Sequence, residues 1–481
     1  MNFLLIANIL GMWMLLYCGA LLPPLIVSLI YNDGEATHLS LSLLLNLLIG
    51  IIIWLRTEKR KVKLRTRDGF IIVLILWLVT SIFGAVPFAI ALEMSPVDAI
   101  FESVSAFTTT GATVISGLDQ LPKSILFFRQ EMQWLGGIGV VVSAITLLPM
   151  LGIGGMQMFK AETPGPIKDE KLTPRILNTA HVMWRLYLVM TAACAVLYWF
   201  GGMSVFDAIA HSFSTLSTGG FSTHDASLGY FNSVFIEMVA VVFMLLGGIN
   251  FGVHFLVWKR LSFRPYFSNL EVRTFLILVA VITLLVGWVL YSGRVKVGFP
   301  ESLRYAVFTV VSIITSTGFG IDNFSLWPSF LPLLLIFISF IGGCSGSTAG
   351  GIKVIRFIIM GKGVGLELQQ LLHPRLVMSL KVQNKVVAPR TVDAVRGYFS
   401  VYVATFILLL LLLLGEGMDL VTAFSAIATC MNNLGPGLGE VAANFKSVTE
   451  PTKWILSFAM LLGRLEMFTL LVVLSPSFWR H

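Results

Sequence analysis

A four-part pattern occurs four times in this chain, and it limits the possible folds more than any other feature. Each copy contains a long apolar segment, a short apolar segment that opens with an acidic or hydroxyl residue, a turn rich in Ser, Thr and Gly, and a second long apolar segment. The turns recur at intervals of roughly one hundred residues, which is far longer than the period of solenoid repeats. The chain is therefore predicted to consist of four related structural units.

The short segment and the turn of each unit can be read directly from the sequence. The four copies are SPVDAIFESVSAFTTTGAT, GGMSVFDAIAHSFSTLSTGGF, GFPESLRYAVFTVVSIITSTGFG and GEGMDLVTAFSAIATCMNNLGPG. On its own, one Ser-Thr-Gly turn is typical of a helix cap or of close packing between helices. Four turns in register indicate instead one structural element that is used four times.

The long apolar segments indicate a membrane protein. Hydrophobic residues make up 56% of the chain, charged residues only 12%, and the mean hydropathy is +0.87. A soluble domain of this composition would leave much of its apolar surface exposed to water. We count about ten segments that approach the roughly 20 residues needed to span a bilayer.

The short segments are too short to cross the bilayer. Non-helical backbone persists at membrane depth only where it is buried in protein or lines a water-filled cavity. We therefore interpret these segments as re-entrant helices whose turns meet around one pore. The predicted fold is an all-α integral membrane protein with four pseudo-fourfold-related span–pore loop–span repeats around this pore, preceded by a two-helix hairpin. The hairpin and the repeats are placed at residues 1–64, 65–160, 161–265, 266–380 and 381–481, and the second span of the third repeat is interrupted.

The formal net charge of +8 does not indicate nucleic acid binding, because the basic residues lie in a few clusters between apolar segments. Two of these clusters lie within residues 56–67 and 353–390. By the positive-inside rule these loops are cytoplasmic, so all four short helices enter the membrane from the opposite side. Solvated loops without topological meaning are the alternative.

The turns have the chemistry of a cation filter. A monovalent cation gives up its hydration shell only where other oxygens replace it, and four loops around an axis can supply rings of backbone carbonyls. Glycine reaches positive φ without steric cost and is therefore favoured in such turns. We assign Gly111, Gly219, Gly318 and Gly435 to one ring position. The predicted ion-binding residues are Thr109, Thr110, Gly111, Ser217, Thr218, Gly219, Ser316, Thr317, Gly318, Asn433, Leu434 and Gly435.

Six sequence segments resemble a known family. They are FTTTGATV, QWLGGIGVVV, STLSTGGFST, SFIGGCSGSTAGGIKVIR, NNLGPGLG and GRLEMFTLL. Together they are similar to the Trk/Ktr/HKT superfamily of cation transporters and, within it, to TrkH-type potassium uptake subunits, over essentially the whole chain. The resemblance implies K+ as the ion bound at the filter residues and transported, with no other cofactor. It also implies a homodimer in the lipid of a bacterial inner membrane, with a cytosolic, nucleotide-binding regulatory ring of the TrkA type.

The segment IGGCSGSTAGG, residues 341–351, interrupts the second span of the third repeat. Its density of Gly and Ser predicts a flexible break, and close packing through small residues is the alternative. The resemblance implies that this break forms an intramembrane loop beneath the filter that obstructs the pore. The predicted gate residues are Gly346, Ser347, Thr348, Ala349, Gly350 and Arg464.

Arg464 lies near the middle of the last apolar segment, where a charge costs about 2.5–3.5 kcal/mol on insertion scales. An ion pair with Glu466 or hydrogen bonds to backbone carbonyls would offset this cost. The resemblance implies instead that Arg464 is a positive barrier beside the loop, which slows cations until the gate moves.

Two other functions are compatible with parts of the sequence. A secondary transporter coupled to H+ or Na+ would hold its substrate at a broken helix near the bilayer midplane, and its flux would be saturable and coupled. A membrane-embedded transferase or hydrolase would need several titratable groups at one place, whereas the acids of the short segments are spread over the four units. We therefore do not expect an enzyme.

Overall fold

Helices form nearly all the regular structure in the part of the chain that the computed structural model describes. That part comprises residues 3–57, 66–146, 172–296, 298–374, 378–383, 385–465 and 467–480. It contains one short antiparallel pair of strands, β1 (Lys381–Val382) and β2 (Lys385–Val386). The predicted boundaries at 64/65 and 160/161, and the basic residues among 58–65, lie outside the described residues.

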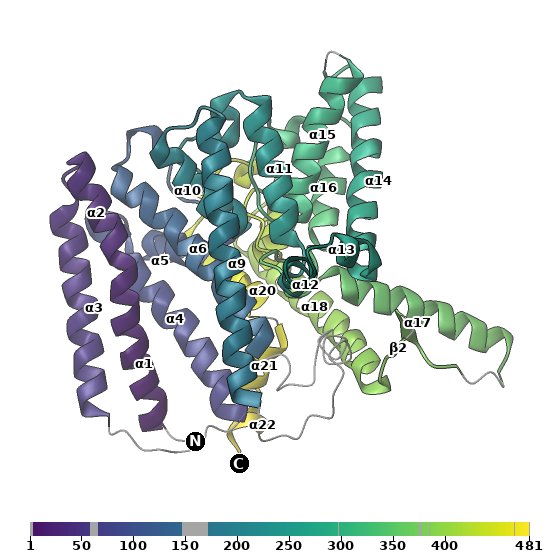
Figure 1. The fold of residues 1–481 in the computed structure, drawn as a ribbon, viewed down its shortest axis with the longest axis horizontal. Coiled ribbons are helices and arrows are strands. Elements are labelled where there is room, and N and C mark those ends of the chain that lie inside the picture. The colour runs from purple at the N-terminus through teal and green to yellow at the C-terminus, as the bar shows by residue number, and fades with distance from the viewer. Residues whose placement is uncertain are drawn as a thin grey trace.

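Three helices form the N-terminal part of the molecule. They are α1 (Phe3–Cys18), α2 (Leu22–Tyr31) and α3 (Ala36–Arg56), with the 3-10 helix η1 (Gly19–Leu21) between the first two. α1 and α3 lie side by side at one edge of the molecule (Figure 1). Glycine permits this close packing, because a Cβ atom added to Gly11 would lie 2.8 Å from the backbone nitrogen of Trp54.

After these helices, one order of elements occurs four times: a long helix, a short helix, a turn and a second helical segment. The long helices are α4 (Thr66–Ala91), α9 (Leu172–Phe200), α14 (Leu270–Ser292) and α18 (Pro389–Gly415). The short helices are α5 (Pro96–Phe107), α10 (Val205–Leu216), α15 (Phe299–Ile314) and α19 (Leu420–Met431). The second segments are α6 (Lys123–Thr146), α11 (Val234–Gly248) with α12 (Phe251–Arg260), α16 (Leu331–Ser339) with α17 (Val354–Leu372), and α20 (Glu450–Arg464) with α21 (Met467–Leu474).

The remaining elements are short. A 3-10 helix follows each of the four turns: η2 (Leu118–Gln120), η4 (Ser227–Phe231), η5 (Phe324–Leu326) and η6 (Gly439–Val441). A further short helix, α13 (Arg264–Ser268), precedes α14. The last helix of the described chain is α22 (Pro476–Trp479). The first element after each turn is therefore the same in all four units.

Six helical segments of the described residues are long and apolar enough to cross a membrane: two in the N-terminal part, and the long helix of each unit. The pair α11–α12, which is bent by 100°, would be a seventh. The sequence indicated about ten spans when the second segments of all four units were included. Those segments are broken into shorter helices or, in α6, contain buried polar side chains such as Arg129 and Gln133.

The break between α11 and α12 has a local cause. The side chain of Asn250 caps α12 by accepting a hydrogen bond of 2.7 Å from the amide of Gly252, a position that favours Asn. The last carbonyls of α11 then have no partner within the helix. Those of Gly247 and Gly248 accept hydrogen bonds from the amides of Thr348 and Cys344, at 3.1 and 2.8 Å. The break thus provides a docking point for the segment that follows α16.

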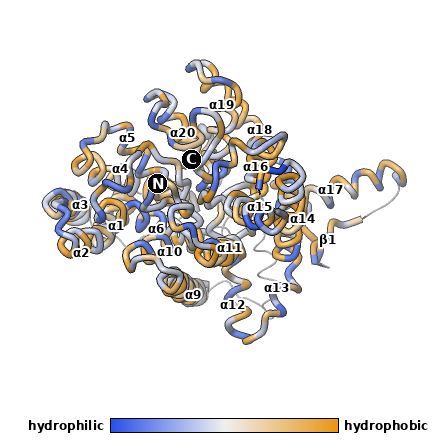
Figure 2. Tube along the Cα trace, turned by 90° about the horizontal axis from the view of Figure 1, so that it is seen from above, coloured by the Kyte–Doolittle hydropathy of each residue, from blue (hydrophilic) through white to orange (hydrophobic). Residues whose placement is uncertain are grey.

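The four short helices lie around the middle of the molecule, with α1–α3 at one edge and α17 projecting from the opposite edge (Figure 2). Several of their buried hydroxyl groups find acceptors within the helix, whereas the hydroxyls of Ser105 and Ser214 have no hydrogen-bond partner among the described residues. The hydroxyls of Thr108 and Thr315, for example, each donate a 2.7 Å bond to the carbonyl four residues earlier. Buried polar groups satisfied in this way do not destabilise the packing, so the ends of the four short helices can approach one another.

Candidate filter and gate

The short helices begin at capping residues. The Oγ atoms of Ser95 and Ser204 accept hydrogen bonds of 3.1 and 3.0 Å from the amides of Asp98 and Asp207. Asp419 accepts two bonds of 3.0 Å at the start of α19, whereas α15 has no side-chain cap. Polar and acidic residues at these positions stabilise the positive ends of the helix dipoles. The partially negative C-terminal ends lead directly into the four turns.

The four turns share one backbone geometry. The first turn residue has a left-handed φ in every unit: 54° at Thr109, 51° at Thr218, 51° at Ser316 and 53° at Asn433. The amide of the next residue donates to a carbonyl of the short helix: Thr110 to Ser105, Gly219 to Ser214, Thr317 to Ser312, and Leu434 to Thr429, at 2.8–2.9 Å. The third residue is a glycine with positive φ: 80° at Gly111, 78° at Gly220, 82° at Gly318 and 95° at Gly435.

This geometry corrects one residue of the predicted ring. We assigned Gly219 to the position of the turn glycine, but the residue with the equivalent φ is Gly220, and Gly219 corresponds to Thr110. Two adjacent glycines made the alignment ambiguous. A constant spacing resolves it, because the turn glycine follows the capping residue by 16 positions in the first, second and fourth units.

The four turns contact one another in a closed ring. A Cβ atom added to any of the four turn glycines would overlap or crowd a backbone carbonyl oxygen of the next turn. The pairs are Gly111 with Gly219, Gly220 with Thr317, Gly318 with Leu434, and Gly435 with Thr110. The last pair returns to the first turn, so residues of all four predicted loops meet at one place.

A buried ion pair lies behind the first two turns. Glu102 is 0% exposed, and its carboxylate is 2.7 Å from the guanidinium of Arg129. Glu102 also accepts hydrogen bonds of 3.0 Å from the hydroxyl of Thr113 and the amide of Val114. Arg129 donates in turn to the carbonyl of Ser222, at 3.3 Å. Buried charges need such complete pairing, so this pair fixes the outer ends of both turns.

The predicted gate segment is a loop. α16 ends at Ser339 and α17 begins at Val354, so the helical path is interrupted between them. The amide of Val354 donates 3.1 Å to the carbonyl of Gly343, which draws the two ends of the loop together. Glu271 of α14 accepts a hydrogen bond of 2.7 Å from the amide of Ser345. The loop is therefore held in one conformation by its own backbone and by α14.

The centre of this loop lies against the turns. The hydroxyl of Thr348 is 3.0 Å from two carbonyls, those of Leu216 at the end of α10 and Gly247 of α11. The amide of Gly350 donates 2.5 Å to the Oγ of Ser316 in the third turn. Two of the predicted gate residues, Thr348 and Gly350, thus lie beside the second and third turns.

Arg464 ends α20 and is 6% exposed. Its Nη1 donates 2.8 Å to the carbonyl of Thr348, and its Nη2 lies 3.5 Å from the carbonyl of Gly136 in α6. Of the two kinds of partner considered from the sequence, backbone carbonyls are present, while Glu466 lies outside the described residues. The guanidinium therefore connects the gate loop with the first unit.

Comparison with known proteins identifies the family. The TrkH family model, described as a cation transport protein, matches residues 38–480. The Trk system potassium uptake protein TrkH of Vibrio parahaemolyticus is 48% identical over the full length of both chains. The chain belongs to the TrkH family of cation transport proteins. The TrkH protein of Escherichia coli is 45% identical, again over all of both chains. The crystal structure of the potassium transporter TrkH from Vibrio parahaemolyticus matches with a TM-score of 0.93 and 45% identity, covering 100% of each chain.

These matches confirm the predicted resemblance to TrkH-type subunits and the helical membrane fold. As a TrkH-family protein with six or seven helices able to cross a membrane, the chain is a multi-pass membrane protein. Its relatives are named as potassium uptake proteins.

Four residues in or beside the turns and the loop were not predicted from the sequence. Besides Gly220, they are Arg129 and Gln133 on α6, and Lys353, whose ammonium donates to the carbonyl of Ala349 in the gate loop. Arg129 interrupts an apolar run with a charge, which is the signal that marks an intramembrane ionisable residue as a candidate for function. Gln133 has no such signal.

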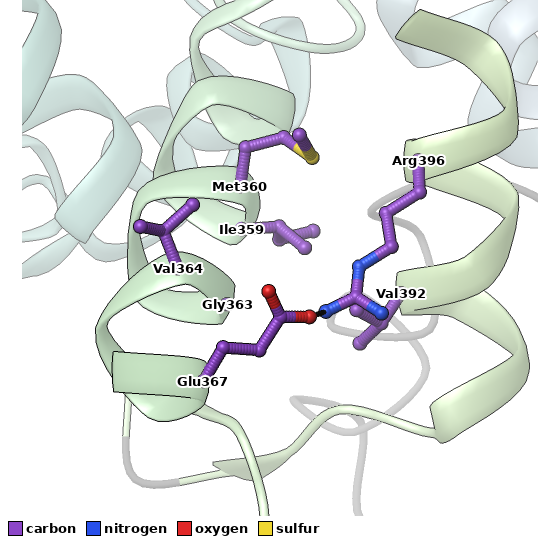
Figure 3. Close-up of a pocket in the computed structure, with 7 residues that line it drawn as sticks. All are labelled: Ile359, Met360, Gly363, Val364, Glu367, Val392 and Arg396. Atoms are coloured by element: carbon purple, nitrogen blue, oxygen red, sulfur yellow. Dashed lines mark hydrogen bonds and ion pairs between the residues drawn. The ribbon is translucent and has the colours of Figure 1, made fainter. Parts of the chain in front are cut away.

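A cavity of about 280 Å³ lies between α17 and α18 (Figure 3). An ion pair between Glu367 and Arg396 joins the two helices beside it. Its other lining residues are Ile359, Met360, Gly363, Val364 and Val392. None of the predicted filter or gate residues lines this cavity.

Proposed function

We propose that this chain takes up potassium through a single filter that its four turns form around a pseudo-fourfold axis. The closed ring of glycine–carbonyl contacts carries this proposal. Four loops that meet in this way can present stacked rings of carbonyl oxygens, which replace the hydration shell of a desolvated cation. The relatives are named as potassium uptake proteins, which supports K+ as the transported substrate.

The ion ligands in this proposal are the oxygens of the predicted filter residues, with Gly220 in place of Gly219 at the ring position of the glycine. Positive φ at the four turn glycines supports this role, because alternating backbone conformations direct successive carbonyls to one side. The C-terminal ends of α5, α10, α15 and α19 add partial negative charge beneath the filter.

The intramembrane loop is the gate in this proposal, and Arg464 is its cationic lock. The contacts of Thr348 with Leu216 and of Gly350 with Ser316 support this role, because they hold the loop against the turns. A guanidinium close to the ion path also repels cations. Conduction then requires the loop and Arg464 to separate.

We also propose a homodimer in the bacterial inner membrane, regulated by a cytosolic nucleotide-binding ring of the TrkA type. The relatives are named as parts of a Trk system, which supports association with other components. α17 projects from the helical body (Figure 1) and exposes Leu368, Leu371 and Leu372, which supplies apolar surface for lipid or for a second copy. The molecular mass of the purified protein in detergent, measured by light scattering, tests the dimer.

Uptake of radioactive rubidium into liposomes that contain only the purified chain tests the central proposal. We expect excess external KCl to suppress rubidium uptake and an equal concentration of NaCl to suppress it far less. Gly318→Ser should reduce this difference, because the added side chain would overlap the carbonyl of Leu434. Equal suppression by both salts in the wild-type protein would contradict a potassium filter.

A coupled secondary transporter is the second candidate function. The discontinuous segments α11–α12 and α16–α17 favour it, because broken helices form the substrate sites of many transporters. Imposed pH or sodium gradients distinguish the two. Rubidium accumulation driven by either gradient, with no rubidium gradient or membrane potential present, would indicate coupling. Flux that follows only the electrochemical gradient of rubidium would indicate a filter.

A further inference from the structure

One buried side chain distinguishes the second turn from the other three. Gln133 of α6 is 0% exposed. Its Nε2 donates 2.7 Å to the carbonyl of Gly219, and its Oε1 accepts a 3.1 Å bond from the amide of Phe221. A carbonyl needs a donor and an amide needs an acceptor, so these two partners fix the orientation of the carboxamide. One side chain therefore holds the peptide groups on both sides of Gly220.

The Gly219 carbonyl is one of four equivalent oxygens. The others belong to Thr110, Thr317 and Leu434, and each of the four lies against the turn glycine of a neighbouring unit. Within the described part of the chain, Gln133 donates to the Gly219 oxygen, and no hydrogen bond donor is found at the other three. The ring of oxygens is therefore asymmetric, because the protein already holds one of them.

Two more side chains of α6 hold the same segment. The Nε2 of Gln130 donates 3.1 Å to the carbonyl of Phe221. The guanidinium of Arg129 lies over the Phe221 ring, 3.9 Å from its centre. Arg129 and Gln133 are four residues apart and so project from the same face of the helix. A helix of the first unit thus braces the turn of the second.

The position of Gln133 is occupied by methionine in two other units. In each of units 1, 2 and 4, one glycine of the second segment lies against the last carbonyl of the short helix: Gly136, Gly247 and Gly463. The residues three positions earlier are Gln133, Met244 and Met460, and all three are buried. Methionine has a similar length but provides no N–H donor. The polar brace is therefore a feature of the first unit rather than a requirement of the repeated fold.

We propose that Gln133 is a specificity-determining positioning residue of the filter. Its carboxamide holds the segment 219–221, so that the Gly219 oxygen keeps the distance that a desolvated potassium ion requires. This inference rests on the proposed function. Discrimination between K+ and Na+ depends on cavity size and on the number and field strength of the coordinating carbonyls. Without the brace, this oxygen is free to move towards the axis and to coordinate the smaller sodium ion.

Gln133→Met tests this role with the residue that units 2 and 4 already use. Rubidium and sodium uptake are measured separately in liposomes that contain the full-length variant. We expect the rubidium-to-sodium uptake ratio to fall about tenfold, since each lost buried hydrogen bond weakens the constraint on the carbonyl. The matched comparison is Gln130→Met, which removes a donor of the same helix from the carbonyl of Phe221, outside the ring. Its ratio should fall clearly less.

The outcomes separate this inference from the proposed function. If the wild-type chain does not prefer rubidium over sodium, the proposed function fails. If the wild-type chain does prefer rubidium, an unchanged ratio in Gln133→Met, or an equal fall in both variants, overturns the role of Gln133 alone. For a variant that transports too little for uptake to be measured, the increase in Tm caused by KCl relative to that caused by NaCl replaces the uptake ratio. If Gln133→Met does not fold, Gln133→Asn, which is one methylene too short to reach both partners, should show the same loss of preference.

Discussion

The guanidinium of Arg464 donates a 2.8 Å hydrogen bond to the main-chain carbonyl of Thr348, at the centre of the loop between α16 and α17. A buried cation is thus bound to the backbone of the segment that we propose as the gate. Because the bond goes to a carbonyl, it depends on the position of the loop and not on the side chain at residue 348.

Replacing Arg464 with Ala should increase rubidium uptake in the absence of any regulatory partner. The substitution removes both the positive charge beside the loop and the bond to Thr348. We expect an increase of about tenfold, which corresponds to the loss of about 1.4 kcal/mol of barrier. Uptake into liposomes that contain only the purified variant measures this. Arg464→Lys is the control, because it keeps the charge but loses the planar donor pair. If rubidium uptake by the Ala variant stays at the wild-type level, Arg464 does not have the proposed role in the gate.

Thr348→Val should loosen the gate loop while preserving the shape of the side chain. The hydroxyl of Thr348 lies 3.0 Å from the carbonyls of Leu216 and Gly247, and its loss should destabilise the closed loop by about 1 kcal/mol. We expect a severalfold rise in rubidium uptake without the partner. Thr348→Ser keeps the hydroxyl and should behave like the wild type. Rubidium uptake by the Val variant no higher than that by the Ser variant would show that these bonds do not limit opening.

Ala substitutions at the two adjacent glycines of the second turn test the corrected alignment. A Cβ at Gly220 would meet the backbone carbonyl of Thr317 at a φ of 78°, where Ala is strained. A Cβ at Gly219 would meet the carboxamide of Gln133, a side chain that can shift at the expense of its two hydrogen bonds, whereas a backbone carbonyl cannot. Gly220→Ala should therefore abolish selective uptake, and Gly219→Ala should retain more of it. Both variants are measured by rubidium uptake with sodium competition. If Gly219→Ala lost more selective uptake than Gly220→Ala, the original assignment of Gly219 to the ring position would be supported.

Glu102→Gln should strongly destabilise the protein. It leaves the guanidinium of Arg129 buried without a counter-charge, and breaking a buried ion pair in this way costs about 3–5 kcal/mol. The Tm of the purified protein in detergent should fall. Asp98→Asn is the comparison, because the ion pair of Asp98 with Lys453 is partly exposed on the Asp98 side and should contribute less. Equal Tm values for the two variants would argue against a structural role for the Glu102–Arg129 pair behind the turns.

The features that sequence reasoning predicted well are those determined by neighbouring residues. Three of the short helices begin at the hydroxyl or acidic residues that were expected to open them. Ser95, Ser204 and Asp419 cap these helices, because their side chains reach amides within the next three positions. The break before Val354 follows from the density of glycine around it, which lowers helix propensity.

The features that it missed depend on contacts between distant segments. Gln133 and Gly219 are 86 residues apart in the chain, and nothing local to Gln133 distinguishes it from other polar residues on a helix. The choice between Gly219 and Gly220 was equally inaccessible from the turn itself, because both residues satisfy the same local pattern. Only the spacing from the preceding helix cap, or the position of the next turn, decides between them.

The closed ring of turns is encoded by four different stretches of one polypeptide. In a channel assembled from identical subunits, a single codon change alters the pore loop of every subunit at once. Here, one codon change alters a single turn and leaves the other three as they were, so the proposed filter can change in smaller steps. The same independence allows the first unit to carry Gln133 while the second and fourth units carry methionine at that position.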